Sequence, residues 1–340
     1  MRLSIPFFIM LFCVSFIHAA DNGKLIWKTK TGGTIHISPC IADGKVYIPS
    51  EDKALYCLDA VTGKTVWTFQ TEAGISTIPA VSGGYVYFGS PHGYLYLVDI
   101  KTGTKMWTLK IGGSVYSAPL VWNNKIYVGS KDNNLYCVDP KAGTTLWTFA
   151  ASAMIYSNPV IADGKVYFGC YDNNVYCVDA YSGKKVWSFE TGSFISSSPC
   201  VSGGMVYIGS YDTVFYCLDA KTGKQQWTLE TGAPVYASPV LMDGNVIIGS
   251  SAGKLYSLDG KTGKKGWTYA TGEDVFYCAS DGKLYTGGAA NGVYCLDAKA
   301  GKKLWTYKGK LPLVSPPVLT GGKLYLGGAD GNVYCIDAGK

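Results

Sequence analysis

The segment Asp219-Ala220-Lys221-Thr222-Gly223-Lys224-Gln225-Gln226-Trp227 decides the fold, because close copies of it recur along the chain. Its tryptophan marks the repeat: equivalent tryptophans stand forty residues apart, except for a last interval of thirty-eight. They are Trp27, Trp67, Trp107, Trp147, Trp187, Trp227, Trp267 and Trp305. A repeat of about forty residues, built from short alternating strands and glycine-rich turns, is typical of a four-stranded propeller blade.

Each repeat divides into four predicted strands. In the first repeat they run near residues 34–41, 45–50, 54–59 and 64–70, and both faces of the resulting sheet are apolar or aromatic. A sheet buried on both sides needs a neighbour on both sides, which a ring of blades supplies. Turn-forming pairs between the first and second strands predict tight hairpins with positive φ. These pairs are Asp43-Gly44, Gly83-Gly84, Asn123-Asn124, Asp163-Gly164, Gly203-Gly204, Asp243-Gly244, Asp281-Gly282 and Gly321-Gly322.

Two series of tyrosines follow the same period, and we interpret both as packing residues. The second-strand series is Tyr47, Tyr87, Tyr127, Tyr167, Tyr207, Tyr285 and Tyr325, with Ile247 as the exception. The third-strand series is Tyr56, Tyr96, Tyr136, Tyr176, Tyr216, Tyr256, Tyr294 and Tyr334.

The last repeat ends at Lys340 before it has an outer strand, whereas Gly23 to Lys28 has an outer-strand sequence and precedes the first inner strand. We therefore expect the N-terminal strand to complete the last blade and to remove the free edges of the ring. The predicted fold is all-β: an eight-bladed β-propeller of four-stranded blades.

Residues 1–20 have the features of a secretory signal peptide: Arg2, an apolar run from Ile5 to Ile17, and a small-residue end at Ala19-Ala20. The run is too short to span a bilayer. Cys13 raises the alternative of a lipid anchor, but the bulky Phe12 before it argues against that. We expect residues 21–340 to form one monomeric domain, exported to the periplasm or cell surface, with no transmembrane segment.

The charged residues argue against several functions. Arg2 is the only arginine in the chain, so every cation after the signal peptide is a lysine, and the guanidinium forks that read bases and grip phosphates are missing. We therefore expect no nucleic-acid partner. His36, in a predicted inner strand, and His92, in a turn, are the only histidines left, and neither sits in a catalytic or metal-ligating pattern.

Ten cysteines follow the signal peptide, and six of them share one repeat position, two residues before the repeat aspartate. These six are Cys57, Cys137, Cys177, Cys217, Cys295 and Cys335; the other two repeats carry Leu97 and Ser257 there. Equivalent positions of neighbouring blades are too far apart for a disulfide, which needs Cα atoms within about 7 Å. Cys40, Cys200 and Cys278 fall on predicted first strands. We predict mostly free, buried thiols.

The segment around Trp227 resembles the tryptophan docking motif of the pyrroloquinoline quinone (PQQ) repeat propellers, over essentially the whole chain after residue 20. In that family a small residue two before the aspartate, the aspartate, a threonine, a glycine and the tryptophan lock each blade to the next. Here Cys217, Asp219, Thr222, Gly223 and Trp227 match it. The compact form without insertions is similar to the BamB family of outer-membrane assembly factors and related binding propellers of bacterial envelopes.

The resemblance implies a non-catalytic scaffold in the cell envelope that binds a protein partner. One alternative is a PQQ-dependent dehydrogenase, since enzymes of the family hold PQQ and calcium over the propeller axis. Those enzymes use long insertions and a disulfide between sequential cysteines, and this chain has neither, so we expect no catalytic residues, no cofactor and no metal. A sensor or carbohydrate-binding propeller is a third reading, which glycan binding would separate from the scaffold.

The candidate partner-binding residues stand nine positions after each repeat tryptophan, where the chain varies while its surroundings are uniform. They are His36, Ser76, Tyr116, Tyr156, Ser196, Tyr236, Phe276 and Val314. We expect this set near one mouth of the channel as a binding surface; filling space between inner strands is an equally good reading. Trp122, the ninth tryptophan, does not follow the repeat and stands beside the turn Asn123-Asn124. It could be an exposed contact residue, or it could pack over its own hairpin.

Overall fold

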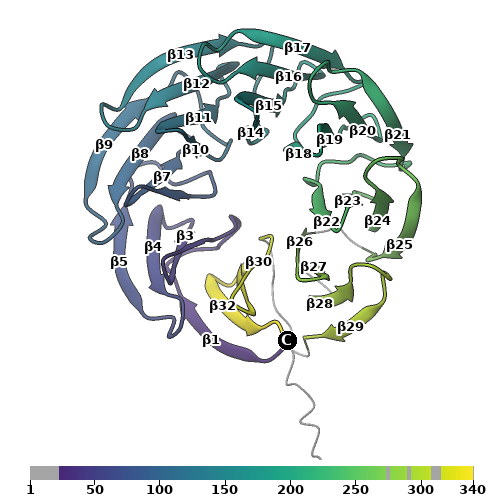
Figure 1. Ribbon diagram of the computed structural model, residues 1–340. Coiled ribbons are helices and arrows are strands. Elements are labelled where there is room, and N and C mark those ends of the chain that lie inside the picture. The colour runs from purple at the N-terminus through teal and green to yellow at the C-terminus, as the bar shows by residue number, and fades with distance from the viewer. Residues whose placement is uncertain (1–22, 273–275, 289–291, 308–314, 340) are drawn as a thin grey trace, which may run out of the picture.

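The computed structural model describes residues 23–272, 276–288, 292–307 and 315–339, and within them it is an all-β ring. Eight antiparallel sheets of four strands each are arranged radially around a central axis (Figure 1). The eight-bladed propeller predicted from the repeat is confirmed. The signal peptide predicted at residues 1–20 lies outside the described residues.

The blades share one order of strands from the axis outwards. The inner strands are β2 (Cys40–Ala42), β6 (Ala80–Ser82), β10 (Leu120–Trp122), β14 (Val160–Ala162), β18 (Cys200–Ser202), β22 (Val240–Met242), β26 (Phe276–Ser280) and β30 (Val318–Thr320). The second strands are β3 (Lys45–Pro49), β7 (Tyr85–Gly89), β11 (Lys125–Gly129), β15 (Lys165–Gly169), β19 (Met205–Gly209), β23 (Asn245–Ser250), β27 (Lys283–Gly288) and β31 (Lys323–Gly327). The third strands are β4 (Ala54–Asp59), β8 (Tyr94–Asp99), β12 (Asn134–Asp139), β16 (Asn174–Asp179), β20 (Val214–Asp219), β24 (Lys254–Asp259), β28 (Gly292–Asp297) and β32 (Asn332–Asp337). The outer strands are β5 (Thr65–Gln70), β9 (Lys105–Lys110), β13 (Thr144–Ala150), β17 (Lys185–Glu190), β21 (Gln225–Glu230), β25 (Lys265–Ala270), β29 (Lys303–Thr306) and β1 (Leu25–Lys30).

The inner strands are shorter than predicted. Residues 34–39 of the first repeat are not strand, and β2 begins only at Cys40. The reason is twofold: Pro39 has no backbone N–H for a ladder, and the N–H of Ile35 donates to Gly328 O of the neighbouring blade. His36 therefore lies on a connection between blades and not on a strand.

The hairpins between first and second strands form as their sequences predict. Asp43 and Gly44 have φ of 49° and 69°, and Asn123 and Asn124 have φ of 46° and 55°. Two consecutive residues with positive φ match the turn whose twist suits an antiparallel hairpin. These hairpins, together with the turns between third and fourth strands, occupy one face of the ring. The connections between blades and the turns between second and third strands occupy the other.

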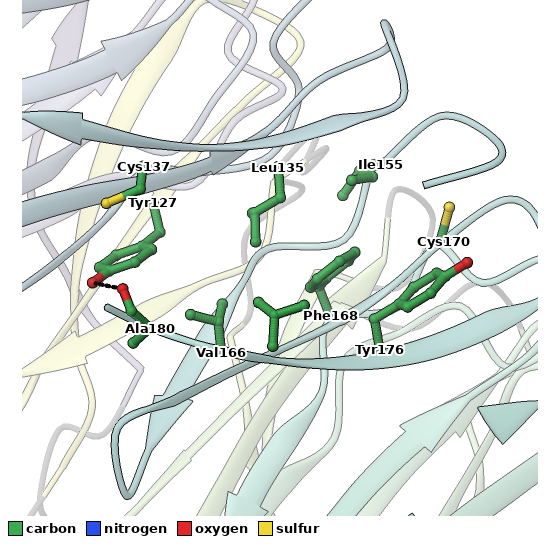
Figure 2. Close-up of a cluster of buried hydrophobic side chains, with 10 residues drawn as sticks. Tyr127, Leu135, Cys137, Ile155, Val166, Phe168, Cys170, Tyr176 and Ala180 are labelled. Atoms are coloured by element: carbon green, nitrogen blue, oxygen red, sulfur yellow. Dashed lines mark hydrogen bonds between the residues drawn. The ribbon is translucent and has the colours of Figure 1, made fainter. Parts of the chain in front are cut away.

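Side chains from two blades interlock at each junction. In blade four Tyr167, Cys177 and Trp187 stand side by side on three strands, since Cys177 is opposite both Tyr167 and Trp187. The rings of Tyr167 and Trp187 lie 5.9 Å apart, and a bulge after Cys177 accommodates the indole. The cysteine series is thus the small residue between two large rings. Figure 2 shows Tyr127 and Cys137 of blade three facing Val166 and Phe168 of blade four.

The same backbone carbonyl accepts both polar groups of this interlock. The indole N–H of Trp187 donates to Ala220 O of the next blade at 3.0 Å, and the Tyr167 hydroxyl donates to the same oxygen at 3.1 Å. Trp227 and Tyr207 share Gly260 O in the same way. Because a buried polar group without a partner costs free energy, these bonds fix the angle between blades.

The N-terminal strand closes the ring, as predicted. Strand β1 pairs antiparallel with β32, and Gly23 N–H donates to Asp337 O at 2.8 Å. Trp27 then donates its indole N–H to Ala60 O of blade one at 3.2 Å. A short segment therefore completes blade eight and docks it against blade one, beside the C-terminus in Figure 1.

The cysteine prediction is confirmed for the described residues. All ten described cysteines are free, seven of them buried and Cys40, Cys200 and Cys278 partly buried. Burial raises the pKa of the Cys217 thiol to about 12, so it remains protonated at neutral pH. No helix able to cross a membrane occurs among the described residues.

Candidate functional site

A row of contacting aromatic rings, three of its five pairs stacked and two tilted, crosses one face of the propeller from the entry to blade three as far as blade six. We call it the aromatic belt; its members are Tyr116, Tyr156, Tyr171, Phe194, Tyr211 and Tyr236. The ring centroids of consecutive members lie 5.4, 4.7, 4.9, 4.0 and 6.0 Å apart. Stacking at such distances stabilises each ring pair by about 0.5 to 1.5 kcal/mol beyond burial. The belt is therefore an ordered surface.

Three of the eight candidates named from the sequence belong to this belt. Tyr116 and Tyr156 stack with an interplanar angle of 29°, and Tyr236 ends the belt. Tyr116 is the most open member, with 38% of its surface exposed. These three positions lie together on one face of the ring. Their role in binding stays a prediction.

The sequence reasoning missed the other three members of the belt. Tyr171 and Tyr211 occupy the turns between second and third strands, at the position of Glu51 in blade one. Phe194 stands two residues before the candidate position, and its carbonyl accepts the N–H of Tyr211 at 3.1 Å. The sequence feature that could have predicted them is the variation at the position of Glu51. The residues there in the next four blades are Pro91, Lys131, Tyr171 and Tyr211.

A cation lies over the open end of the belt. Lys131 Nζ is 4.6 Å from the ring centre of Tyr116 and 5.1 Å from that of Tyr156. Its interaction with Tyr156 raises the pKa of Lys131, so the ammonium group is charged at neutral pH. The belt thus presents a positive charge over the faces of two aromatic rings.

Carboxylates flank the aromatic belt but already hold structural bonds. Asp172 accepts hydrogen bonds from the Tyr176 hydroxyl at 2.7 Å and from Ser152 N–H at 2.9 Å. Asp132 and Asp212 accept from Tyr136 and Tyr216 at 2.6 and 2.7 Å. These bonds tie each turn to its third strand, so the third-strand tyrosines anchor turns as well as pack.

The remaining candidates lie away from the belt. His36 Nε2 is 3.2 Å from Glu51 Oε1, with both side chains about half exposed. The hydroxyl of Ser76 donates to Val115 O, and Ser196 is partly buried. Phe276 begins β26; because Cys278 is opposite Tyr285 as Cys40 is opposite Tyr47, Phe276 stands at the register of Ser38 and not of His36. Val314 lies outside the described residues.

The described residues offer no cluster for a metal ion, since no three His, Cys, Asp or Glu side chains converge there. The absence of a bound cofactor stays a prediction.

The sequence matches the family described as outer membrane protein assembly factor BamB, over residues 16–76, 54–157, 131–276 and 270–340. The chain belongs to this BamB family. None of the curated proteins compared with the chain matches it.

Solved structures agree on the fold. The crystal structure of BamB from Moraxella catarrhalis superposes with a TM-score of 0.82 at 18% sequence identity, over 92% of this chain and 99% of that one. The computationally designed Ika8 protein superposes with a TM-score of 0.83 at 17% identity, over 93% and 100%. At such identities the likeness establishes the propeller and not a shared binding site.

Proposed function

We propose that this chain is an exported, non-catalytic scaffold of the bacterial cell envelope that binds a protein partner through the aromatic belt. Membership of the BamB family supports a role in the envelope. The observation that carries the proposal is the belt itself: six aromatic rings in successive contact, with Lys131 over one end.

The chemistry of the belt suits a protein surface. Tyrosine is enriched at the centres of protein interfaces, where its rigid ring buries apolar area and its hydroxyl still finds a polar partner. The rings are already held by each other, so docking costs little side-chain entropy. Lys131 beside Tyr116 adds a contact for a carboxylate of the partner.

The test is site-specific photo-crosslinking in envelope preparations. A photo-reactive residue in place of Tyr236 should crosslink to one discrete protein, whereas one in place of Lys264, on the opposite face, should not. The double variant Tyr116→Ser, Tyr156→Ser should abolish the crosslink without unfolding, because Ser76 and Ser196 already occupy the same position in two other blades. Equal crosslinking in the double variant would refute docking at the belt.

A further inference from the structure

A cavity of about 580 Å³ opens between blades two and three, on the hairpin face opposite the aromatic belt. Its walls include Tyr85, Tyr87 and Met106 from blade two, and Trp122 and Lys141 from blade three. The volume is in the range of pockets that hold small organic ligands. This site is separate from the surface proposed to bind the protein partner.

The residues that shape the cavity are departures from the repeat. Tyr85 replaces a lysine that stands at the same position in five other blades. Trp122 replaces a small residue, Ala42 in blade one and Ala162 in blade four. The equivalent space between blades eight and one, lined by Lys323 and Ala42, is only about 320 Å³. Tyr85 and Trp122 also pack against the core, and the ring of Trp122 lies edge-on to Tyr181 of blade four at 5.6 Å, but of the two cavities only the larger has two such aromatic side chains in its lining.

The hydroxyl of Tyr87 in the cavity wall has no hydrogen-bond partner among the described residues, and it differs from the buried, unpaired hydroxyl of Tyr47 at the equivalent position of blade one in that it opens into the cavity. At the next junctions the hydroxyls of Tyr127 and Tyr167 donate to backbone carbonyls at 2.9 and 3.1 Å; Figure 2 shows the bond from Tyr127 to Ala180. Tyr87 holds the same position and is only 3% exposed, yet it has no hydrogen bond within the described part of the chain. Burial raises its pKa, so the group remains a donor at neutral pH. A ligand acceptor in the cavity would take the hydrogen bond that this hydroxyl makes with no group of the described protein.

The charges around the cavity select the ligand further. Its lining contains no carboxylate, whereas Lys141 and the side chains of Asn123 and Asn124 stand at its rim. A sugar, which needs acceptors for several hydroxyl groups, finds few here. A flat apolar body with an anionic group fits, because rings and Met106 offer the apolar wall and Lys141 the counter-charge.

We propose that this cavity binds an oxygen-substituted aromatic carboxylate. The ring lies against Tyr85 and Trp122, the carboxylate meets Lys141, and the ring oxygen accepts the hydrogen bond of Tyr87.

The experiment is isothermal titration calorimetry of the protein with 6-hydroxy-2-naphthoate. We expect one molecule to bind per chain, and 2-naphthoate, which lacks the ring oxygen, to bind about three- to tenfold more weakly. Tyr87→Phe should lower the affinity for 6-hydroxy-2-naphthoate by a similar factor and should remove the difference between the two probes. Lys141→Gln should weaken both. Tyr85→Lys and Trp122→Ala, which restore residues of other blades, should abolish binding while the protein stays folded.

The matched control is Tyr167→Phe at another junction. It removes the bond to Ala220 O, so it should lower the Tm and leave the affinity unchanged, whereas Tyr87→Phe should leave the Tm unchanged. Absence of binding by both naphthoates would overturn the proposal, as would equal binding to Trp122→Ala. Binding of maltose that Trp122→Ala abolishes would also overturn it, in favour of a sugar site.

Discussion

At the scale of single residues, the docking turn depends on a glycine for two separate reasons. Gly223 has φ of 72°, and a Cβ there would lie 2.7 Å from a ring carbon of Trp187 in the preceding blade. Gly203 also has positive φ, at 57°, but a Cβ there would meet nothing within 4 Å. Comparing Gly223 with Gly203 therefore distinguishes the effect of backbone strain from that of a steric clash within one blade.

Gly223→Ala should therefore destabilise the protein by about 2 to 4 kcal/mol, because left-handed strain and overpacking against Trp187 add together. Gly203→Ala should cost only about 1 to 2 kcal/mol, from strain alone. Urea unfolding at neutral pH measures both. Equal losses in the two variants would show that the indole yields to the new methyl group.

Because of the buried thiols, the free energy of unfolding should fall as the pH rises into the alkaline range. Burial raises the pKa of Cys177 and Cys217 to about 12, whereas an unfolded thiol titrates near pH 8.5. Their contribution is complete below about pH 8.5 and is lost as the pH rises towards 12, since only the unfolded chain then releases the protons. Each thiol lowers the free energy of unfolding by about 1.4 kcal/mol per pH unit in that window.

Cys217→Ser tests this directly, because Ser257 already stands at the equivalent position of blade six. The slope of unfolding free energy between pH 9 and pH 11 should become shallower by about 1.4 kcal/mol per pH unit. Denaturant titrations at four pH values give that slope. An unchanged slope would mean that the thiol ionises equally in the folded protein.

At the scale of strands, β1 carries both contacts that close the ring. Deleting residues 21–30 removes its pairing with β32 and the docking of Trp27 on Ala60, and it leaves Trp305 without Gly23 against its ring. We expect the whole domain to lose at least about 3 kcal/mol, the lower end for removing a packed tryptophan. Thermal unfolding by circular dichroism measures it, with Lys28→Ala on the exposed side of β1 as control. A full melting temperature in the truncated chain would refute closure by β1.

The strands also show how far the sequence alone can go. Periodic tryptophans and paired turn residues are enough to predict the number of blades, the hairpins and the closure of the ring. The same local pattern occurs in all eight repeats, so each copy supports the others. The inner strands were overestimated, since the bonds that divert residues such as Ile35 run to another blade. The sequence predicts only three of the six belt residues for the same reason. Tyr171 and Phe194 occupy different positions of the repeat, and they come into contact only in the folded ring.

At the scale of the whole molecule, the two faces of the propeller differ in charge. The turns between third and fourth strands carry exposed lysines, among them Lys184, Lys185, Lys264 and Lys302. The aromatic-belt face carries Glu51 and the turn aspartates, which accept hydrogen bonds from tyrosines. We expect the lysine-bearing face to favour anionic surfaces and the aromatic-belt face to take the proposed protein partner.

Reversing these four lysines to glutamate should weaken binding to vesicles that contain anionic phosphatidylglycerol, by about 1 kcal/mol for each lysine near the surface. The effect should fade with added salt, because the Debye length is only about 8 Å at physiological ionic strength. Vesicle co-sedimentation at low salt measures it, and Lys131→Glu on the opposite face is the matched control. Because the reversed residues lie far from Tyr236, crosslinking at the aromatic belt should persist in the same variant. Unchanged co-sedimentation at low salt would leave the lysine rim as solubilising charge alone.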